Sequence, residues 1–231
     1  MTLVWSPETA SKAYLDTIQI CGISSKTTAA EFLSAIAAGY NAKLIVEVRR
    51  KQESGNANIP TSTGLAIAAK HTHGRHVCVV PDEASRVEYV STMHKLLADV
   101  SLPEVVVGEV EEVMRKKLIN RVDFLIVDGG KKDFARALSS VKLSQHGAIL
   151  VCKSESKMNN ISVSSRFSWK GVLDDKVNVV RAITLPFGNY GLEIAYIASS
   201  NYDGSLKSRK NPKHWIRHVD QDSGEEHVFR R

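Results

Sequence analysis

The chain has 231 residues, of which 43% are hydrophobic and 24% are charged, and this composition suits one α/β domain or, less well, two small ones. The formal net charge of +6 is compatible with an acidic ligand but does not by itself indicate a nucleic acid. The three cysteines form no CxxC pair, no apolar run is long enough to span a membrane and no secretory signal is visible, so we expect a reduced protein of the cytosol or nucleus.

Local signals along the chain predict helices that alternate with short apolar strands. The clearest helix start is Ser6-Pro7-Glu8, where Ser6 caps the helix, Pro7 suits the first helical position and Glu8 faces the positive end of the helix dipole. The predicted helices are Pro7–Ile18, Thr28–Ala38 ended by Gly39, Gly64–Lys70 capped by Ser62 or Thr63, Glu83–Leu97, Val110–Leu118 and Phe134–Val141. The predicted strands are Lys43–Val48, His76–Val80, Val105–Val107, Val122–Val127, Ala148–Cys152, Asn178–Leu185 and Leu192–Ala198.

The order of these elements predicts an α/β fold. Strands that alternate with helices favour right-handed βαβ units and a parallel sheet covered by helices on both faces. Residues 186–191 separate the last two strands in a hairpin pattern, so we expect an antiparallel pair at one edge of the sheet. The apolar run that starts after Asp123 ends at Gly129-Gly130 and delivers Asp128 to a strand end. Open α/β sheets bind their ligands at such strand ends.

We expect the chain to divide into an α/β domain, residues 1–198, and a basic tail, residues 199–231. Ser, Asn, Gly, Lys and Arg dominate the tail and apolar residues are few, which predicts a flexible segment. The part from 207 to 217 mixes basic residues with one tryptophan. It would contact phosphates, act as a nuclear targeting segment or remain a solvated tail, and we favour the solvated tail.

Several segments in a fixed order carry a family resemblance. These segments are 44–48, 62–68, 77–83, 123–133, 147–150, 185–189 and 191–192. Their order resembles that of class I S-adenosylmethionine (SAM)-dependent methyltransferases, and in detail the O-methyltransferase-like branch. The chain also resembles a plant family of uncharacterised proteins with this fold, in which the opening residues 5–8 and 12–14 are familiar. The resemblance extends from Ser6 to about Ala198, and it implies a seven-stranded Rossmann-like sheet that ends in an antiparallel hairpin.

The resemblance implies a glycine-rich turn after the first strand, where the cofactor's methionyl part would lie. Glu47 matches the acidic residue that opens this motif, but Arg49 stands at the next glycine position. Arg49 and Arg50 would crowd the methionyl end, or hold an acidic ligand, or lie on a solvated surface loop, which we favour. Gly64, in the matching segment that follows, is also a predicted cofactor-binding residue.

The ribose and adenine positions are only partly matched. Val80 stands where the resemblance implies an acid that would accept hydrogen bonds from the ribose hydroxyls. Asp82, two residues later, would either replace that acid or cap the following helix, and we favour the cap. Glu109 matches the position near the adenine, although a glutamate at a helix start also has an ordinary role in opposing the helix dipole.

Asp128 is the best-matched site residue and the best candidate for a catalytic residue. The resemblance implies that this carboxylate joins two further oxygen ligands to hold a divalent cation, as hard cations require. Cys152 and Lys153 stand at those two positions, so no metal is expected. Asp128 would therefore work without a metal, or it would only cap the end of its strand. The histidines between 71 and 76 match no zinc spacing either.

We favour a methyltransferase-like protein with a degenerate SAM site. Arg49, Val80, Cys152 and Lys153 stand where site residues are expected, and function depends on the site rather than on the fold. Such a protein would be non-catalytic or would bind an altered ligand. It would bind a protein partner or a small acidic ligand, and would act as a binding or regulatory protein.

Two alternatives remain open. Glu47, Glu109 and Asp128 are compatible with an active SAM-dependent O-methyltransferase that uses SAM as its cofactor and no divalent metal. Binding of nucleic acid through residues 49–51 and the basic tail is a third hypothesis. The aromatic content of only 6% offers no stacking platform for bases, so we rank this hypothesis last.

Overall fold

The protein forms two compact units, Met1–Asn201 and Tyr202–Arg231, and each is described by itself. The computed structural model describes residues 4–22, 29–50, 59–97, 100–115, 119, 121–154, 169, 172–173, 179–187, 190–198, 215–219 and 226–230. Among these residues, no helix combines the length and the apolar character needed to cross a membrane.

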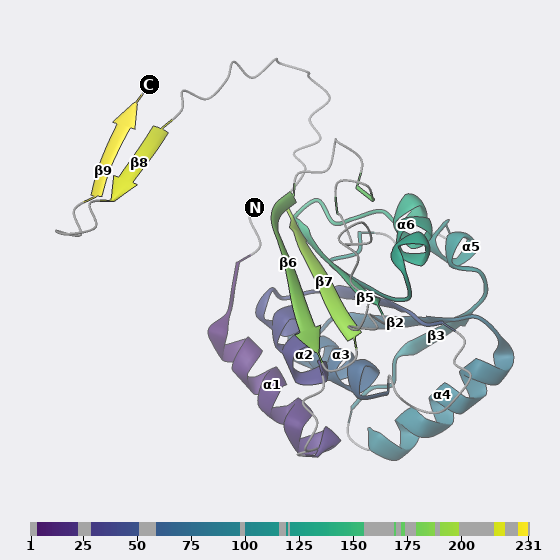
Figure 1. Cartoon of the computed structure of the whole chain (residues 1–231). Coiled ribbons are helices and arrows are strands. Elements are labelled where there is room, and N and C mark those ends of the chain that lie inside the picture. The colour runs from purple at the N-terminus through teal and green to yellow at the C-terminus, as the bar shows by residue number, and fades with distance from the viewer. Residues whose placement is uncertain are drawn as a thin grey trace. The chain divides into compact units, whose positions relative to one another are not determined.

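A seven-stranded sheet forms the centre of the first unit, with the order β3-β2-β1-β4-β5-β7-β6 (Figure 1). Its strands are β1 (Leu44–Val48), β2 (Arg75–Val80), β3 (Glu104–Val107), β4 (Phe124–Asp128), β5 (Ala148–Ser154), β6 (Val179–Phe187) and β7 (Tyr190–Ile197). The first five strands pair in parallel, and β7 pairs antiparallel with both β5 and β6. The predicted parallel sheet with an antiparallel pair at one edge is therefore confirmed.

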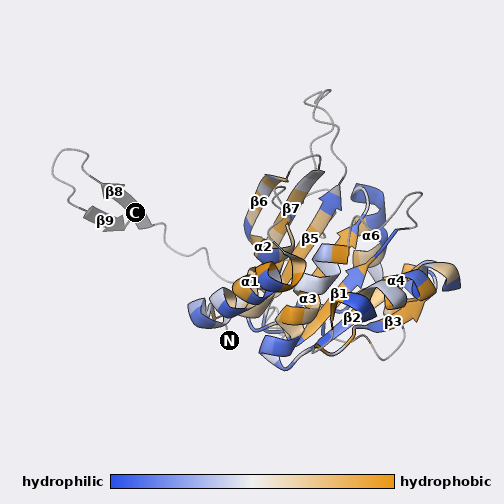
Figure 2. Ribbon diagram, turned by 90° about the horizontal axis from the view of Figure 1, so that it is seen from below, coloured by the Kyte–Doolittle hydropathy of each residue, from blue (hydrophilic) through white to orange (hydrophobic). Residues whose placement is uncertain are grey.

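Helices cover both faces of this sheet. The helices are α1 (Pro7–Cys21), α2 (Ala30–Gly39), α3 (Ile59–Thr72), α4 (Glu83–Leu96), α5 (Val110–Arg115) and α6 (Lys131–Ser140). Apolar residues of α2, α3 and α4 share one buried cluster with alternate strand residues, and those of α5 and α6 share a second cluster with the other strand residues. Figure 2 shows strongly hydrophobic residues on the central strands that these clusters bury. Strands buried on both faces explain the continuous apolar runs in the sequence.

Two local predictions have different outcomes. Ser6 caps α1 as expected, because its side chain accepts a hydrogen bond from the Thr9 backbone N–H. The predicted cap of α3 is wrong: the helix already begins at Ile59, so Ser62 and Thr63 are buried inside it. The hydroxyl of Thr63 donates to the Ile59 carbonyl within the helix. Ser62 and Thr63 therefore have interior partners, which sequence signals for caps do not detect.

The second unit contains a two-stranded antiparallel sheet. Its strands are β8 (Trp215–Val219) and β9 (Glu226–Arg230), with Trp215 opposite Arg230 at one end and Val219 opposite Glu226 at the other. The sequence did not indicate these strands, because polar and charged residues interrupt them. The flexibility that composition predicts for residues 199–231 stays a prediction.

Helices α2 and α3 approach each other closely at Gly64. A Cβ atom added at this position would lie 2.6 Å from the Ala30 carbonyl oxygen and 3.3 Å from the Ser34 Cβ. The nearest of these contacts is with helical backbone, which cannot move aside as a flexible side chain would. The glycine therefore sets the distance between the two helices that cover this face of the sheet.

We expect the substitution Gly64→Ala to destabilise the protein by about 1–3 kcal/mol, because overpacking of a tight interface outweighs the better helix propensity of alanine. Urea unfolding measures this free energy. Lys70→Ala, at an exposed position of the same helix, is the control and should change stability by less than about 0.5 kcal/mol. Equal stability of the two variants would contradict the close contact.

Candidate functional site

A pocket lies at the carboxyl ends of strands β1 to β4. Its cavity volume is about 150 Å³. The lining residues come from the ends of these strands and from the starts of α5 and α6: Val48, Arg49, Arg50, Val79, Val80, Pro81, Gly108, Glu109, Val110, Val127, Asp128, Asp133 and Arg136. The chain runs outward from β1 to β3 on one side and from β4 to β5 on the other. The pocket therefore lies at the topological switch point, where open α/β sheets bind ligands.

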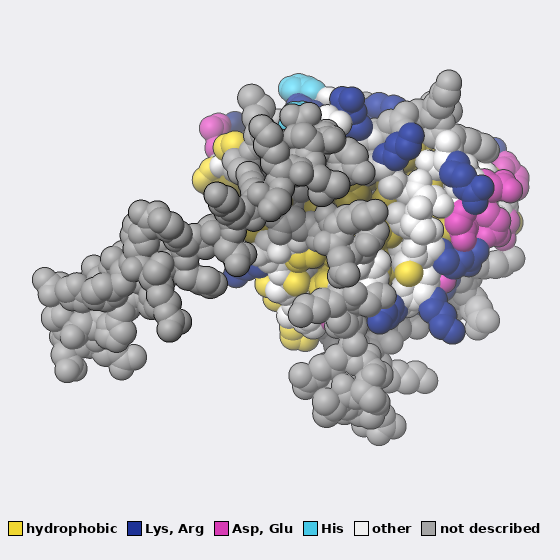
Figure 3. All heavy atoms as spheres, turned by 90° about the horizontal axis from the view of Figure 1, so that it is seen from above, with side chains coloured by type: hydrophobic (Ala, Val, Ile, Leu, Met, Phe, Trp, Pro, Cys, Tyr) yellow, Lys and Arg dark blue, Asp and Glu magenta, His cyan; other side chains and the backbone are white. Residues whose placement is uncertain are grey.

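The pocket combines an apolar wall with charges of both signs. Valines from three strands supply the apolar wall. Arg136 lies 3.6 Å from Glu109 and donates to Glu111 at 2.7 Å, and Asp133 accepts a hydrogen bond from the Gly130 backbone N–H at 3.0 Å. Figure 3 likewise shows Lys and Arg side chains next to Asp and Glu side chains along one edge of the molecule. The rim of the pocket therefore carries both positive and negative side chains.

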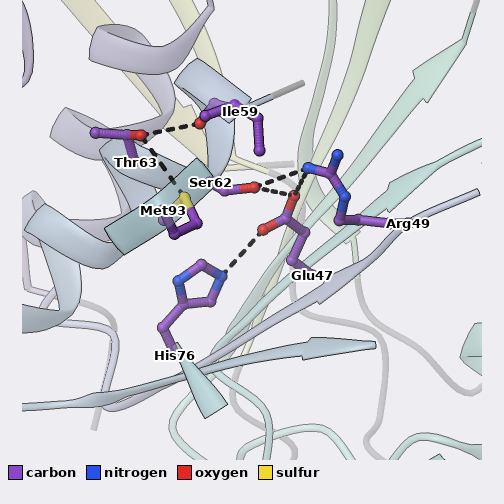
Figure 4. Close-up of polar contacts among 7 residues, drawn as sticks. All are labelled: Glu47, Arg49, Ile59, Ser62, Thr63, His76 and Met93. Carbon is purple, nitrogen blue, oxygen red and sulfur yellow. Dashed lines mark hydrogen bonds and ion pairs between the residues drawn. The ribbon is translucent and has the colours of Figure 1, made fainter. Parts of the chain in front are cut away.

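Glu47 lies at the carboxyl end of β1 but does not face the pocket. Its side chain is only 4% exposed, and it points to the face of the sheet that α3 covers. Ser62 Oγ donates to Glu47 Oε1 at 2.7 Å. The other carboxylate oxygen, Oε2, lies 3.2 Å from Nε2 of His76 on β2, which donates because an ionised carboxylate only accepts. Figure 4 shows these side chains converging from β1, β2 and α3.

Arg49 connects this buried carboxylate with the pocket. Its guanidinium Nη1 donates to Ser62 Oγ at 3.0 Å and lies 3.4 Å from Glu47 Oε1 (Figure 4). The guanidinium carbon is 5.0 Å from the ring centre of Tyr89, a cation–π distance. The side chain is only 12% exposed. The expectation that Arg49 lies on a solvated surface loop is therefore wrong, because a buried carboxylate and an aromatic ring hold it inside.

The groups around Glu47 and Arg49 determine the pKa values of both side chains. Burial raises the pKa of Glu47, but the His76 hydrogen bond, the Arg49 charge and the Ser62 hydrogen bond together outweigh burial, and the net pKa lies below its ordinary value. Burial also opposes the charge of Arg49, yet the nearby Glu47 raises the pKa of Arg49 overall. Both groups are therefore charged at neutral pH, as an internal ion pair.

Asp128 reaches the pocket from the end of β4, as the sequence predicts. Burial raises its pKa, the positive charges of Lys153 and Arg50 lower it, and the net pKa is above the ordinary value. Lys153 is the Cα partner of Asp128 on the neighbouring strand, and it is itself buried. The carboxylate therefore sits half-buried in the pocket with basic residues around it.

The other predicted site residues separate into two groups. Glu109 lines the pocket, and so does Val80, the residue at the position expected for the ribose acid. Asp82 caps α4 by accepting a hydrogen bond from the Ser85 backbone N–H at 2.8 Å, and Gly64 lies in the contact between α2 and α3. Neither Asp82 nor Gly64 is among the residues that line this pocket. A role for any of these residues in cofactor binding stays a prediction.

Sequence reasoning missed three residues that shape the site, namely Ser62, His76 and Tyr89. The sequence held a signal for His76, because His76 and Glu47 are polar residues in two otherwise apolar predicted strands. In the structure, His76 lies next to Ile45 and close to Glu47 on the same face of the sheet. A polar residue on each of two adjacent buried strands indicates that the two pair inside. Tyr89 lies on a helix far along the chain, and no spacing in the sequence relates it to Arg49.

The two positions expected to hold a metal are buried. The thiol of Cys152 donates weakly to the Gly129 carbonyl at 3.5 Å, and burial raises its pKa to about 12. Lys153 is 7% exposed. In the part of the chain that the structure describes, no group of three or more His, Cys, Asp or Glu residues is placed to hold a metal ion. A protonated thiol and an ammonium group do not fit a hard cation, which requires oxygen ligands.

Comparison with known proteins identifies a family and a fold. A family model with the description "Protein of unknown function (DUF1442)" matches residues 1–231. No curated protein matches the chain. The expectation that the family is a plant family stays a prediction.

Solved methyltransferase structures are similar to this chain. A methyltransferase of Podospora anserina bound to S-adenosylhomocysteine (SAH) has a TM-score of 0.54 and 13% identity, covering 85% of this chain and 90% of that chain. An O-methyltransferase of Bacillus cereus in complex with SAH has a TM-score of 0.53 and 15% identity, covering 85% and 93%. A methyltransferase of Geobacter sulfurreducens has a TM-score of 0.50 and 18% identity, covering 82% and 88%. The methyltransferase-type Rossmann-like fold is therefore confirmed, and at these identities the likeness shows the fold alone.

We expect Glu47→Gln to destabilise the protein at pH 7 by about 3–5 kcal/mol, because it removes the carboxylate charge that pairs with the buried Arg49. The folded-state pKa of Glu47 lies below its ordinary value of 4.5, so its stabilisation is fully present above that value. This stabilisation is lost as the pH falls through the lower folded-state pKa. The difference in unfolding free energy between wild type and variant should therefore shrink in acid, as urea unfolding at several pH values would measure.

The control is Glu83→Gln, which removes an exposed carboxylate paired with Arg86 on α4. Its effect on stability should be small, because solvent screens an exposed ion pair. A Glu47→Gln variant as stable as wild type at pH 7 would show that the buried pair does not hold this region together.

Proposed function

We propose that this chain, which belongs to the DUF1442 family of proteins of unknown function, is a methyltransferase-like binding protein that no longer transfers methyl groups. Its pocket lies at the switch point of the sheet, where a Rossmann-like protein binds its ligand. The residues around the pocket differ from those that a SAM site requires. The proposed role is binding or regulation through a protein partner or a small acidic ligand, in the cytosol or nucleus.

The position of Arg49 is the observation that carries this proposal. A glycine at this turn would let the backbone approach the cofactor closely, whereas an arginine side chain occupies space beside the pocket. Contacts with Glu47, Ser62 and Tyr89 hold the guanidinium in place. The cavity volume of about 150 Å³ is below the range of roughly 300–1,000 Å³ that is typical of small-molecule sites.

The acidic groups that would recognise SAM are missing or already engaged. Glu47 is bonded inside the protein to Ser62 and His76, so reorienting it toward a ligand would break a buried network. The side chain of Val80 supplies no acceptor for ribose hydroxyls, and Asp82 is engaged as a helix cap. These observations support a site that has lost its ordinary cofactor contacts.

The composition of the pocket supports a different ligand. Arg50 and Arg136 stand at the rim, and a guanidinium group matches the geometry of a carboxylate or a phosphate. The valines of the wall favour an apolar body of modest size. A small organic anion with an apolar part combines these two requirements.

An active SAM-dependent O-methyltransferase without a divalent metal is the second candidate. Glu109 and Asp128 both line the pocket, at positions where the family resemblance places adenine contacts and catalysis. The raised pKa of Asp128, due to burial, moves it toward the range that suits a proton acceptor. If SAM binds, Arg49 must leave its present position or the cofactor must lie further out.

Nucleic-acid binding has less support than either candidate. Arg49 is largely buried and paired with Glu47, so it does not contribute a free charge to a phosphate-binding surface. Lys51 lies outside the described residues. This hypothesis would therefore depend on Arg50 and on the basic residues of the tail.

We expect no heat of binding when wild-type protein is titrated with SAH or SAM in a calorimeter, and no thermal shift at millimolar cofactor. The substitution Arg49→Gly should enlarge the cavity and increase SAH affinity, because it restores glycine at the turn. Arg49→Lys, which keeps a long cationic side chain, is the matched control and should not bind. Circular dichroism establishes that each variant is folded.

Micromolar SAH binding by the wild type would contradict the claim that the cofactor site is closed. If methyl transfer to any acceptor then accompanies that binding and is lost in Asp128→Asn, the chain is an enzyme and the second candidate is correct. Binding without transfer would leave the protein a cofactor-binding protein that is not catalytic, and would overturn only the claim that the cofactor site is closed.

A further inference from the structure

The pocket at the carboxyl ends of β1 to β4 is lined by charges of both signs in equal number. Among the residues that the structure describes, its charged lining consists of Glu109, Asp128, Asp133, Arg49, Arg50 and Arg136. A ligand with only a negative charge would lie against carboxylates, and like charges brought together are unfavourable. A ligand that carries both a positive and a negative group avoids this cost.

Most of these charged groups shape the rim or point into the protein. Glu109 lies 3.6 Å from Arg136 and its side chain is 72% exposed. The exposed Asp133 accepts a hydrogen bond from the Gly130 backbone N–H at 3.0 Å. Arg49 points away from the pocket, toward its buried partner (Figure 4). The recognition of a ligand's charges therefore centres on the two remaining groups, Asp128 and Arg50.

Asp128 and Arg50 bring opposite charges close together. Asp128 ends β4 and is partly buried, whereas Arg50 is exposed just after β1, and these two strands are neighbours in the sheet. Burial raises the pKa of Asp128, and the charges of Lys153 and Arg50 act against this effect, so both cations lie near the carboxylate. A carboxylate has about four acceptor sites. Asp128 therefore has the capacity to accept hydrogen bonds from a ligand while it keeps its basic neighbours.

The wall beside these two charges is aliphatic. Val48, Val79 and Val127 line the pocket from three strands, and no aromatic residue is among the described residues that line it. The cavity volume is about 150 Å³, and an engineered apolar cavity of about that size binds benzene. The pocket therefore has room for a short aliphatic side chain.

We propose that the pocket binds a free α-amino acid with an aliphatic side chain, of the size of leucine, isoleucine or valine. The ligand's carboxylate pairs with Arg50, its ammonium group pairs with Asp128, and its side chain lies against the valines. Opposite charges on a single carbon atom match two opposite charges of the protein that lie close together. This inference rests on the function proposed above, because it keeps the anionic group and the apolar part of that ligand and adds a cationic group.

Calorimetric titration of the full chain with L-leucine and two analogues tests this assignment. Isocaproate has the same carbon skeleton but lacks the ammonium group, and isoamylamine lacks the carboxylate. We expect saturable binding of leucine, in roughly the micromolar to millimolar range for so small a ligand. Each analogue should bind about tenfold more weakly or worse, the usual effect of losing a hydrogen bond to a charged group. Glycine, which lacks the apolar part, should also bind at least about tenfold more weakly.

Two variants assign the charged groups of the ligand to their partners. Asp128→Asn should weaken leucine binding by about tenfold or more without weakening isocaproate binding, because isocaproate has no ammonium group. Arg50→Gln should weaken leucine and isocaproate alike and leave isoamylamine unaffected. A misfolded variant would lose every ligand, so the retained analogue shows that the pocket is intact. Glu88→Gln removes an exposed carboxylate of α4 that does not line the pocket, and it should bind leucine as the wild type does.

The result that would overturn the inference differs from the result that would overturn the proposed function. Equal affinity for leucine and isocaproate, with both lost in Arg50→Gln, would exclude the amino acid and leave a small acidic ligand in place. The absence of saturable binding of leucine, isoleucine and valine would also overturn the inference. The proposed function fails instead if the chain transfers methyl groups from SAM.

Discussion

The carboxylate of Glu47 is buried at the end of the first strand, so it requires hydrogen-bond donors and an opposite charge inside the protein. The elements around it supply these groups. Glu47 is 4% exposed at its side chain, and an unpaired charge at such a position would cost several kcal/mol, roughly. Ser62 on α3 and His76 on β2 supply hydrogen bonds, and Arg49 supplies the opposite charge. One residue thus ties together two strands, a helix and the start of the strand-end loop.

The alternation of side chains along β1 explains why the Glu47 side chain points into the protein under α3 rather than into the pocket. Val46 and Val48 belong to the cluster on the face that α5 and α6 cover, whereas Ile45 belongs to the cluster under α2 to α4. Glu47 shares the parity of Ile45 and therefore points under α3. Arg49 follows it with the same parity. The Arg49 guanidinium therefore points toward Glu47 inside the protein. The pocket has an apolar wall and a rim of acidic and basic side chains.

The fold was largely predictable, and the site only in part. Apolar runs that alternate with helical patterns define a parallel sheet, and Asp128 was correctly placed at a strand end because the carboxyl ends of parallel strands share one edge. The start of α3 was predicted five residues too late, at Gly64 instead of Ile59. The hydroxyl of Ser62 donates to Glu47 and does not cap the helix terminus. The inward position of Arg49 was not predictable, because Ser62 on α3 and Tyr89 on α4 reach it only through the packing of these helices against the sheet.

By itself, the sequence determined the order of the elements, the hairpin at the sheet edge, and which residues lie at the strand ends. These features follow from periodicity and from glycine and proline positions, which act over a few residues. Only the tertiary structure decided which polar groups meet inside the protein: Glu47 with Arg49, Ser62 and His76. The contacts of Glu47 with Ser62 and His76 depend on how α3 and β2 pack against β1, and packing alone sets those distances.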